Sequence, residues 1–92
     1  MALSSKYTLV VFYSKTNQLS LNTRIVVNEF VIDNFGSEDI SVTEVDYESD
    51  KSRAIEYGVM GTPAIVLLKD GRLIKRHLGE ITTYELKTMV SE

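Results

Sequence analysis

Hydrophobic and polar positions along the chain change their spacing several times, and each change marks an expected element. Residues 6–13 contain a continuous apolar run rich in β-branched and aromatic side chains, which is typical of a strand buried on both faces. Over residues 18–34 the apolar side chains recur at i and i+4, as Leu21 and Ile25 do, which predicts a helix packed on a sheet. Gly36 is placed to end this helix in a left-handed conformation.

The rest of the chain predicts shorter elements. In order, these are a strand at 40–45, a helix at 51–57, a buried strand at 64–68 and an edge strand at 72–78. Asp50 is suited to cap the short helix, and Gly58 is suited to end it. Asp70 and Gly71 form the dipeptide that a tight hairpin turn prefers, so the last two strands are expected to pair.

The final helix, at 83–90, carries a clear start signal. Thr82 and Glu85 have the spacing of a capping box, and Ile81 and Leu86 occupy the positions of a hydrophobic staple. The predicted order is therefore β-α-β-α-β-β-α. This order favours an α/β fold with a four-stranded mixed sheet flanked by three helices.

Composition narrows the range of functions. With 92 residues and no linker or repeat, we expect one domain, 1–92, with a modest core. No apolar run approaches the ~20 residues of a membrane helix, and no secretory signal is visible, so we expect a cytoplasmic protein without a membrane partner. A net charge of −3 and a pI near 5.1 argue against a dedicated nucleic-acid binder. The chain has no cysteine, which excludes disulfides, thiolate metal sites and thiol catalysis.

One segment and the order of elements carry a resemblance to a known family. Residues 57–71 read YGVMGTPAIVLLKDG, which resembles the thioredoxin superfamily and most of all its small archaeal-type thioredoxin- or glutaredoxin-like proteins. In those proteins a helix ending in E-Y-G is followed by an apolar pair, a cis-proline and a strand. The resemblance spans about residues 7–90 and implies a thioredoxin-like fold with a cis bond between Thr62 and Pro63.

The chain departs from the family where the family carries its chemistry. Thioredoxins have a C-x-x-C motif at the start of the long helix. One alignment puts Asn17, Gln18, Leu19 and Ser20 at these positions, and a second register puts Gln18 and Leu21 at the two cysteine positions. Neither register places a cysteine at these positions. Because disulfide exchange needs an attacking thiolate, the resemblance implies a redox-inactive protein.

The same resemblance implies a binding groove that needs no thiol. In the family, the cis turn leaves the backbone of the preceding residue free to pair with an extended peptide. Carried over, the groove consists of Thr16, Asn17, Gly61, Thr62, Pro63 and Gly79. As a single side chain, Asn17 is interpreted as a helix cap rather than a catalytic group. The expected partner is an unidentified protein or extended peptide.

The other polar clusters favour structural roles. His77 is the only histidine, which excludes a multi-histidine metal site, and it is expected to be solvated. The basic residues within 69–76 are expected to protect an edge strand. A solvated strand end is the favoured interpretation of the acidic stretch formed by Glu44, Asp46, Glu48 and Asp50. No metal or cofactor is therefore expected.

Three hypotheses on function remain. The first is a redox-inactive thioredoxin-fold module that binds another protein. The second is a disulfide oxidoreductase of the same family whose cysteines have been replaced; Ser20 would be a conventional replacement, but Asn17 would not. The third is a regulatory module like KaiB, which shares the thioredoxin-like N-terminal half but has a proline-rich C-terminal half that this chain lacks.

Overall fold

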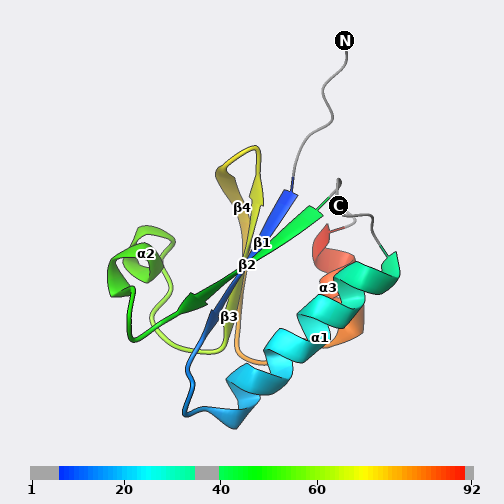
Figure 1. The fold of residues 1–92 in the computed structure, drawn as a ribbon. Helices are drawn as coiled ribbons and strands as arrows, with labels where there is room; N and C mark the ends of the chain where they lie inside the picture. Colours follow the sequence, from blue (N-terminus) through cyan, green and yellow to red (C-terminus); the bar gives the residue numbers. More distant parts are fainter. Residues whose placement is uncertain (1–6, 35–39, 91–92) are drawn as a thin grey trace.

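The computed structural model describes residues 7–34 and 40–90 (Figure 1). In chain order the elements are β1 (Tyr7–Tyr13), α1 (Gln18–Asn34), β2 (Ile40–Asp46), α2 (Lys51–Glu56), β3 (Ala64–Lys69), β4 (Arg72–Leu78) and α3 (Thr83–Val90). The predicted order is confirmed, and the boundaries differ from the prediction by at most one residue. Gly36, expected to end α1, lies outside the described residues.

The four strands form one mixed sheet in the order β2-β1-β3-β4. β1 pairs parallel with β2, and β3 pairs antiparallel with both β1 and β4. The two strands with continuous apolar runs, β1 and β3, lie in the centre, where both faces of a strand are covered. Among the described strands, β2 and β4 form the two edges.

The helices divide between the two faces of the sheet, with α1 and α3 on one face and α2 on the other (Figure 1). Successive side chains of a strand point to opposite faces, so β1 and β3 supply both cores. The larger core lies with α1 and α3 and contains Leu9, Val11, Val27, Phe30, Ile40, Ile65, Leu67, Ile81, Leu86 and Met89. The smaller core lies with α2 and contains Val10, Phe12, Val45, Ala54, Val59, Ala64, Val66 and Leu68.

The short helix α2 begins and ends as the sequence predicts. The Asp50 carboxylate accepts a hydrogen bond from the backbone N–H of Arg53 at 3.3 Å. After the helix, Gly58 has a φ of +73°, and a Cβ at this position would collide with the guanidinium of Arg76. The positive φ therefore favours glycine at this turn, whereas the exposed Arg76 side chain is flexible enough to move aside.

The capping box of α3 is also confirmed. The backbone N–H of Thr82 donates to the Glu85 carboxylate at 2.9 Å, and the backbone N–H of Glu85 donates to the Thr82 hydroxyl at 3.1 Å. Ile81 and Leu86, at the staple positions, are both buried. This start fixes α3 against the sheet beside α1.

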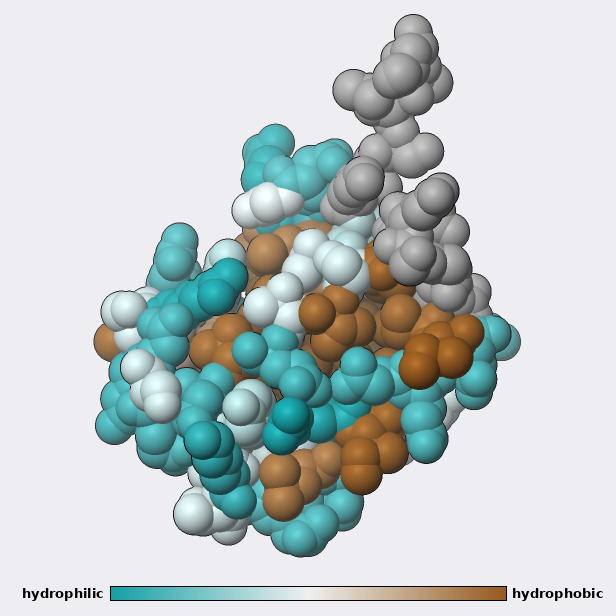
Figure 2. All heavy atoms as spheres, in the orientation of Figure 1, coloured by the Kyte–Doolittle hydropathy of each residue, from teal (hydrophilic) through white to brown (hydrophobic). Residues whose placement is uncertain are grey.

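Several apolar side chains are exposed to solvent. Figure 2 shows hydrophobic patches between hydrophilic side chains on the face that α1 presents, and Ile25 and Ile32 of α1 are exposed. Of the described helices, none has both the length and the apolar character needed to cross a membrane.

Candidate functional site

The connection between β1 and α1 is a tight polar turn. The buried Ser14 hydroxyl lies 3.1 Å from the Thr16 hydroxyl and accepts a hydrogen bond from the backbone N–H of Thr16. The backbone N–H of Asn17 donates to the carbonyl of Ser14 at 3.2 Å. This turn brings Asn17 to the first turn of α1.

Asn17 caps α1, as its residue type predicts. Its side-chain oxygen accepts hydrogen bonds from the backbone N–H groups of Leu19 at 2.9 Å and Ser20 at 3.3 Å. These are two of the donors that the first turn of a helix leaves without an intrahelical acceptor. The side-chain oxygen of Asn17 is thus used for the helix, while its amide N–H₂ group is left for other partners.

That amide group connects the helix start to the loop before β3. Asn17 Nδ2 donates to the backbone carbonyl of Thr62 at 3.4 Å, across 45 residues of sequence. The peptide bond between Thr62 and Pro63 is cis. Two segments that are distant in the sequence therefore meet beside the first turn of α1.

A hollow of about 300 Å³ lies at this loop. It is lined by Met60, Gly61, Thr62, Pro63, Leu78 and Gly79. Four of the predicted groove residues line it, namely Gly61, Thr62, Pro63 and Gly79. Asn17 reaches it through the carbonyl of Thr62, whereas exposed Thr16 bonds only within its own turn among the described residues.

Backbone groups define the edges of this hollow. The backbone N–H of Gly79 donates to the carbonyl of Pro63 at 2.8 Å, which closes the side toward β4. The backbone N–H of Thr62 has no acceptor within the described part of the chain. Thr62 is half-buried as a residue, so this N–H is available to water or to a group from outside the chain.

Sequence reasoning missed two residues of the hollow. Met60 is 88% exposed and Leu78 is 63% exposed, and both present apolar side chains at the rim. The only signal for them is their position directly beside the loop and hairpin of the predicted groove. Pattern rules assign such residues to the core, so their exposure had to come from the structure.

Ser20 lies one turn inside α1 and is fully buried. Its hydroxyl oxygen has no hydrogen-bond partner in the described residues. The neighbouring positions differ: Gln18 is exposed and donates to the Asn22 side chain at 3.0 Å, and Leu21 is half-buried. With no histidine near its hydroxyl, Ser20 lacks the base that would activate a serine nucleophile.

The acidic stretch is more tightly engaged than the expected solvated strand end. The Glu44 carboxylate contacts Arg24 Nη2 at 2.8 Å and accepts from Asn28 Nδ2 at 3.1 Å. The hydrogen bond from Arg24 holds the pKa of Glu44 below its usual range, against the opposing effect of partial burial. Asp46 lies 3.6 Å from Lys15 Nζ. These acids therefore connect β2 to α1 and to the β1–α1 turn.

His77 also differs from the expectation of a solvated side chain. It is half-buried, and its Nε2 atom lies 2.8 Å from the backbone carbonyl of Glu80. The turn from β4 into α3 brings this carbonyl to the imidazole. Across the described ranges, 7–34 and 40–90, no group of three histidine, aspartate or glutamate residues could hold a metal ion.

Comparisons with known proteins agree with this geometry. The thioredoxin family model matches residues 2–92. A mutant thioredoxin from Halobacterium salinarum is 25% identical, covers 92% of this chain and 72% of its own, and superposes with a TM-score of 0.82. A comparison with curated proteins finds no match.

Two further solved structures share the fold at lower identity. Thioredoxin-2, described as a component of the malaria parasite protein secretion machinery, is 18% identical over 97% of this chain and 84% of its own, with a TM-score of 0.82. Trxlp from Edwardsiella tarda is 16% identical over 95% of this chain and 84% of its own, with a TM-score of 0.80. Since the family model covers almost all of the sequence, the chain belongs to the thioredoxin family, although these 92 residues contain no cysteine.

Proposed function

We propose that this protein is a redox-inactive thioredoxin-fold module that binds an extended segment of another protein in the hollow beside Pro63. The observation that carries the proposal is the open backbone N–H of Thr62 within a hollow of about 300 Å³. The absence of cysteine removes the nucleophile of disulfide exchange and leaves this binding surface intact.

The chemistry of the hollow suits a peptide backbone better than a small polar ligand. The N–H of Thr62 offers one main-chain hydrogen bond, which is how an added strand gains affinity. Met60 and Leu78 offer apolar contacts at the rim, and the flexible thioether of methionine adapts to differently shaped side chains. Gly61 leaves open space above the loop, so a ligand backbone has room to approach.

We also propose that Asn17 and Ser20 occupy the positions of the lost redox pair. Asn17 lies at the helix start beside the Thr62 carbonyl, and Ser20 lies one turn further and is buried. This combination of one accessible and one buried position supports the register of Asn17 and Ser20. In the other register, Gln18 bonds to its own helix rather than to the hollow.

The proposal is tested with a displayed library of random heptapeptides. Selected peptides are bound to the ¹⁵N-labelled protein, and we expect the largest chemical-shift changes at Gly61, Thr62 and Gly79. Methylating the peptide nitrogens one at a time should weaken binding at alternate residues, because only every second backbone group of a strand faces its neighbour.

A filled hollow provides the matched control. Gly61→Trp places a large side chain in the open space and should abolish binding, whereas Ile55→Trp, at an exposed position on α2, should leave it unchanged. Equal effects of the two variants, or shift changes away from the hollow, would contradict the proposal. Insulin reduction with dithiothreitol should proceed at the rate of the protein-free blank; a faster rate would contradict redox inactivity.

A further inference from the structure

The edge strand β4 presents backbone groups that no described residue uses. The backbone N–H of Gly79 donates to the carbonyl of Pro63. Because hydrogen-bonded and non-hydrogen-bonded pairs alternate along an antiparallel ladder, the next hydrogen-bonded pair is His77 with Ile65. The N–H and C=O groups of Arg76 and Leu78 therefore point away from β3. Within the described part of the chain, no backbone group bonds to them from the outer side.

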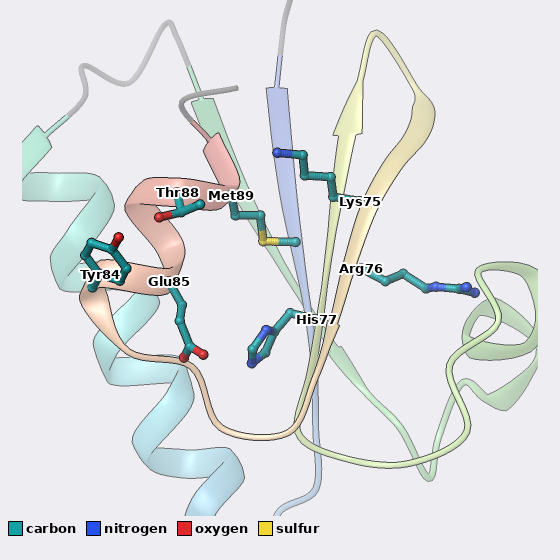
Figure 3. Close-up of a pocket in the computed structure, with 7 residues that line it drawn as sticks. All are labelled: Lys75, Arg76, His77, Tyr84, Glu85, Thr88 and Met89. Atoms are coloured by element: carbon teal, nitrogen blue, oxygen red, sulfur yellow. The ribbon is translucent and has the colours of Figure 1, made fainter.

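The side of β4 that faces α3 is basic. Lys75 and His77 point toward α3 and border a hollow of about 400 Å³ (Figure 3). Its other lining residues on α3 are Tyr84, Glu85, Thr88 and Met89. Glu85 is the only carboxylate among the described residues that line it; the Thr82 N–H holds this carboxylate in the capping box, and the carboxylate also interacts electrostatically with His77.

The opposite side of β4 is largely apolar. Leu73, Ile74 and Leu78 are each more than a third exposed on this strand. Arg76 points away from α3 (Figure 3) and donates to the backbone carbonyl of Tyr57 at 3.0 Å. A strand added at this edge would meet basic groups on one of its faces and mainly apolar groups on the other.

We propose that β4 is a second docking edge that binds an extended acidic peptide by strand addition. The peptide alternates acidic side chains, which lie beside Lys75 and His77, with apolar side chains, which lie beside Leu73 and Leu78. Charge complementarity selects this partner: the whole chain has a net charge of −3, yet residues 69–75 hold three basic side chains and one acid, not counting Arg76, which points away from α3. Such complementarity determines the partner more than it raises raw affinity.

A second copy of the chain fits this edge poorly. Antiparallel pairing of two β4 strands about a twofold axis would place basic side chains against basic side chains, which is destabilising. The acidic edge β2 is already engaged, because Glu44 pairs with Arg24 and Asp46 pairs with Lys15. The basic residues of β4 thus disfavour pairing with a second β4 strand, through like-charge repulsion, and favour pairing with an acidic strand.

The test uses a fluorescent heptapeptide, Glu-Val-Glu-Val-Glu-Val-Glu. Two comparison peptides are a version with lysine in place of each glutamate and an isomer of the same composition in which the glutamates and the valines are grouped in separate blocks. We expect the acidic alternating peptide to bind and to shift the N–H resonance of Arg76, which does not line the hollow beside Pro63. Lys75→Glu should weaken binding about tenfold and favour the lysine peptide. Lys51→Glu, the same charge change at an exposed position on α2, should alter binding by less than about twofold.

Further measurements distinguish binding at β4 from binding in the hollow beside Pro63. Gly61→Trp should leave binding of the acidic peptide unchanged, and a thermal melt by circular dichroism should show that every variant is folded. The proposal is overturned by the absence of binding, by equal losses in the two charge variants, or by shift changes centred on Thr62. Shift changes at β4 that depend on protein concentration without peptide would assign the edge to self-association and would also overturn it.

Discussion

The helices α1 and α3 lie on the same face of the sheet but begin in different ways. At the start of α3, Thr82 and Glu85 exchange two hydrogen bonds, so that each backbone N–H meets the side chain of the other residue. At the start of α1, Asn17 accepts from two helix N–H groups and donates to Thr62, which lies outside the helix. The α3 cap uses only residues at the start of its own helix, whereas the α1 cap also contacts Thr62, which lines the hollow beside Pro63.

This difference separates a structural helix start from a candidate site. A start selected for stability alone satisfies its polar groups locally, as Thr82 and Glu85 do. The start of α1 instead keeps a buried hydroxyl, that of Ser20, with no partner among residues 7–34 and 40–90, and lies next to the N–H of Thr62, which has no acceptor in the same ranges. Local departures of this kind concentrate at functional sites, because function is what compensates for their cost in stability.

The largest change expected is a gain of thiol chemistry at the start of α1. The double substitution Asn17→Cys and Ser20→Cys should create a pair that closes a disulfide under mild oxidation, because one helical turn brings the two side chains to the same face. The thiol at position 17 should be the more acidic one, since the free N–H groups and the dipole of the helix stabilise its anion. Iodoacetamide alkylation against pH, with thiol counting, measures both effects.

The second register supplies the control for this pair. Gln18→Cys with Leu21→Cys has the same spacing, but Gln18 is exposed and its side chain bonds to Asn22. If this second pair closes readily while the first stays reduced, the assignment of Asn17 and Ser20 is wrong by one residue. If neither pair closes, α1 does not begin as a thioredoxin active-site helix does.

Much of the fold was predictable because each element carries its own local signal. The continuous apolar runs of β1 and β3 placed these strands in the centre of the sheet, and the Asp70–Gly71 turn joined β3 to β4. Both turn residues have positive φ, 52° and 84°, as such a turn requires. Likewise, the spacing of Thr82 and Glu85 predicted the start of α3.

The candidate site was less predictable, since long-range packing determines it. The residue type of Asn17 indicated a cap, but only the structure shows that its amide reaches Thr62. A serine at position 20 gives no periodic signal, so its burial depends on how α1 lies on the sheet. The exposure of Met60 contradicts its apolar character, and no rule of sequence pattern finds it.

Removal of the two caps compares the helix starts directly. We expect Asn17→Ala and Thr82→Ala each to lower the free energy of unfolding by about 1 kcal/mol, measured by urea denaturation. Asn17→Asp keeps the acceptor for the helix but loses the donor to Thr62. It should therefore retain stability while weakening binding of the selected heptapeptides. Equal binding by Asn17→Asp and the wild type would show that the contact with Thr62 does not shape the hollow.

The buried hydroxyl of Ser20 predicts a smaller effect of opposite sign. Ser20→Ala should raise the free energy of unfolding by about 0.5–1 kcal/mol, because it removes a buried polar group that has no partner in the described part of the chain and introduces a better helix former. Ser52→Ala, at an exposed position in α2, combines the gain in helix propensity with the loss of the hydrogen bond that the Ser52 hydroxyl donates to Asp50 at 3.1 Å. A loss of stability in Ser20→Ala beyond that of Ser52→Ala would show that the Ser20 hydroxyl is satisfied in solution.

The smallest effect expected is a difference in pH dependence between the two helix starts. The backbone N–H of Thr82 donates to the Glu85 carboxylate and holds the pKa of Glu85 below its usual range. The unfolded chain therefore binds this proton more tightly than the folded protein. The stabilisation is complete above the ordinary glutamate pKa of about 4.3 and is lost as the pH falls through the lower folded value.

Substitutions that keep or remove the titrating group isolate this dependence. Glu85→Gln retains an acceptor for Thr82 but cannot titrate, so its stability should fall less steeply than that of the wild type between about pH 5 and pH 3. The Asn17 cap does not titrate, so Asn17→Ala should shift the whole curve by a constant amount. Glu44, whose pKa is also lowered, remains in every variant and cancels in the comparison. Parallel curves for Glu85→Gln and the wild type would show that the α3 cap is as insensitive to pH as the α1 cap.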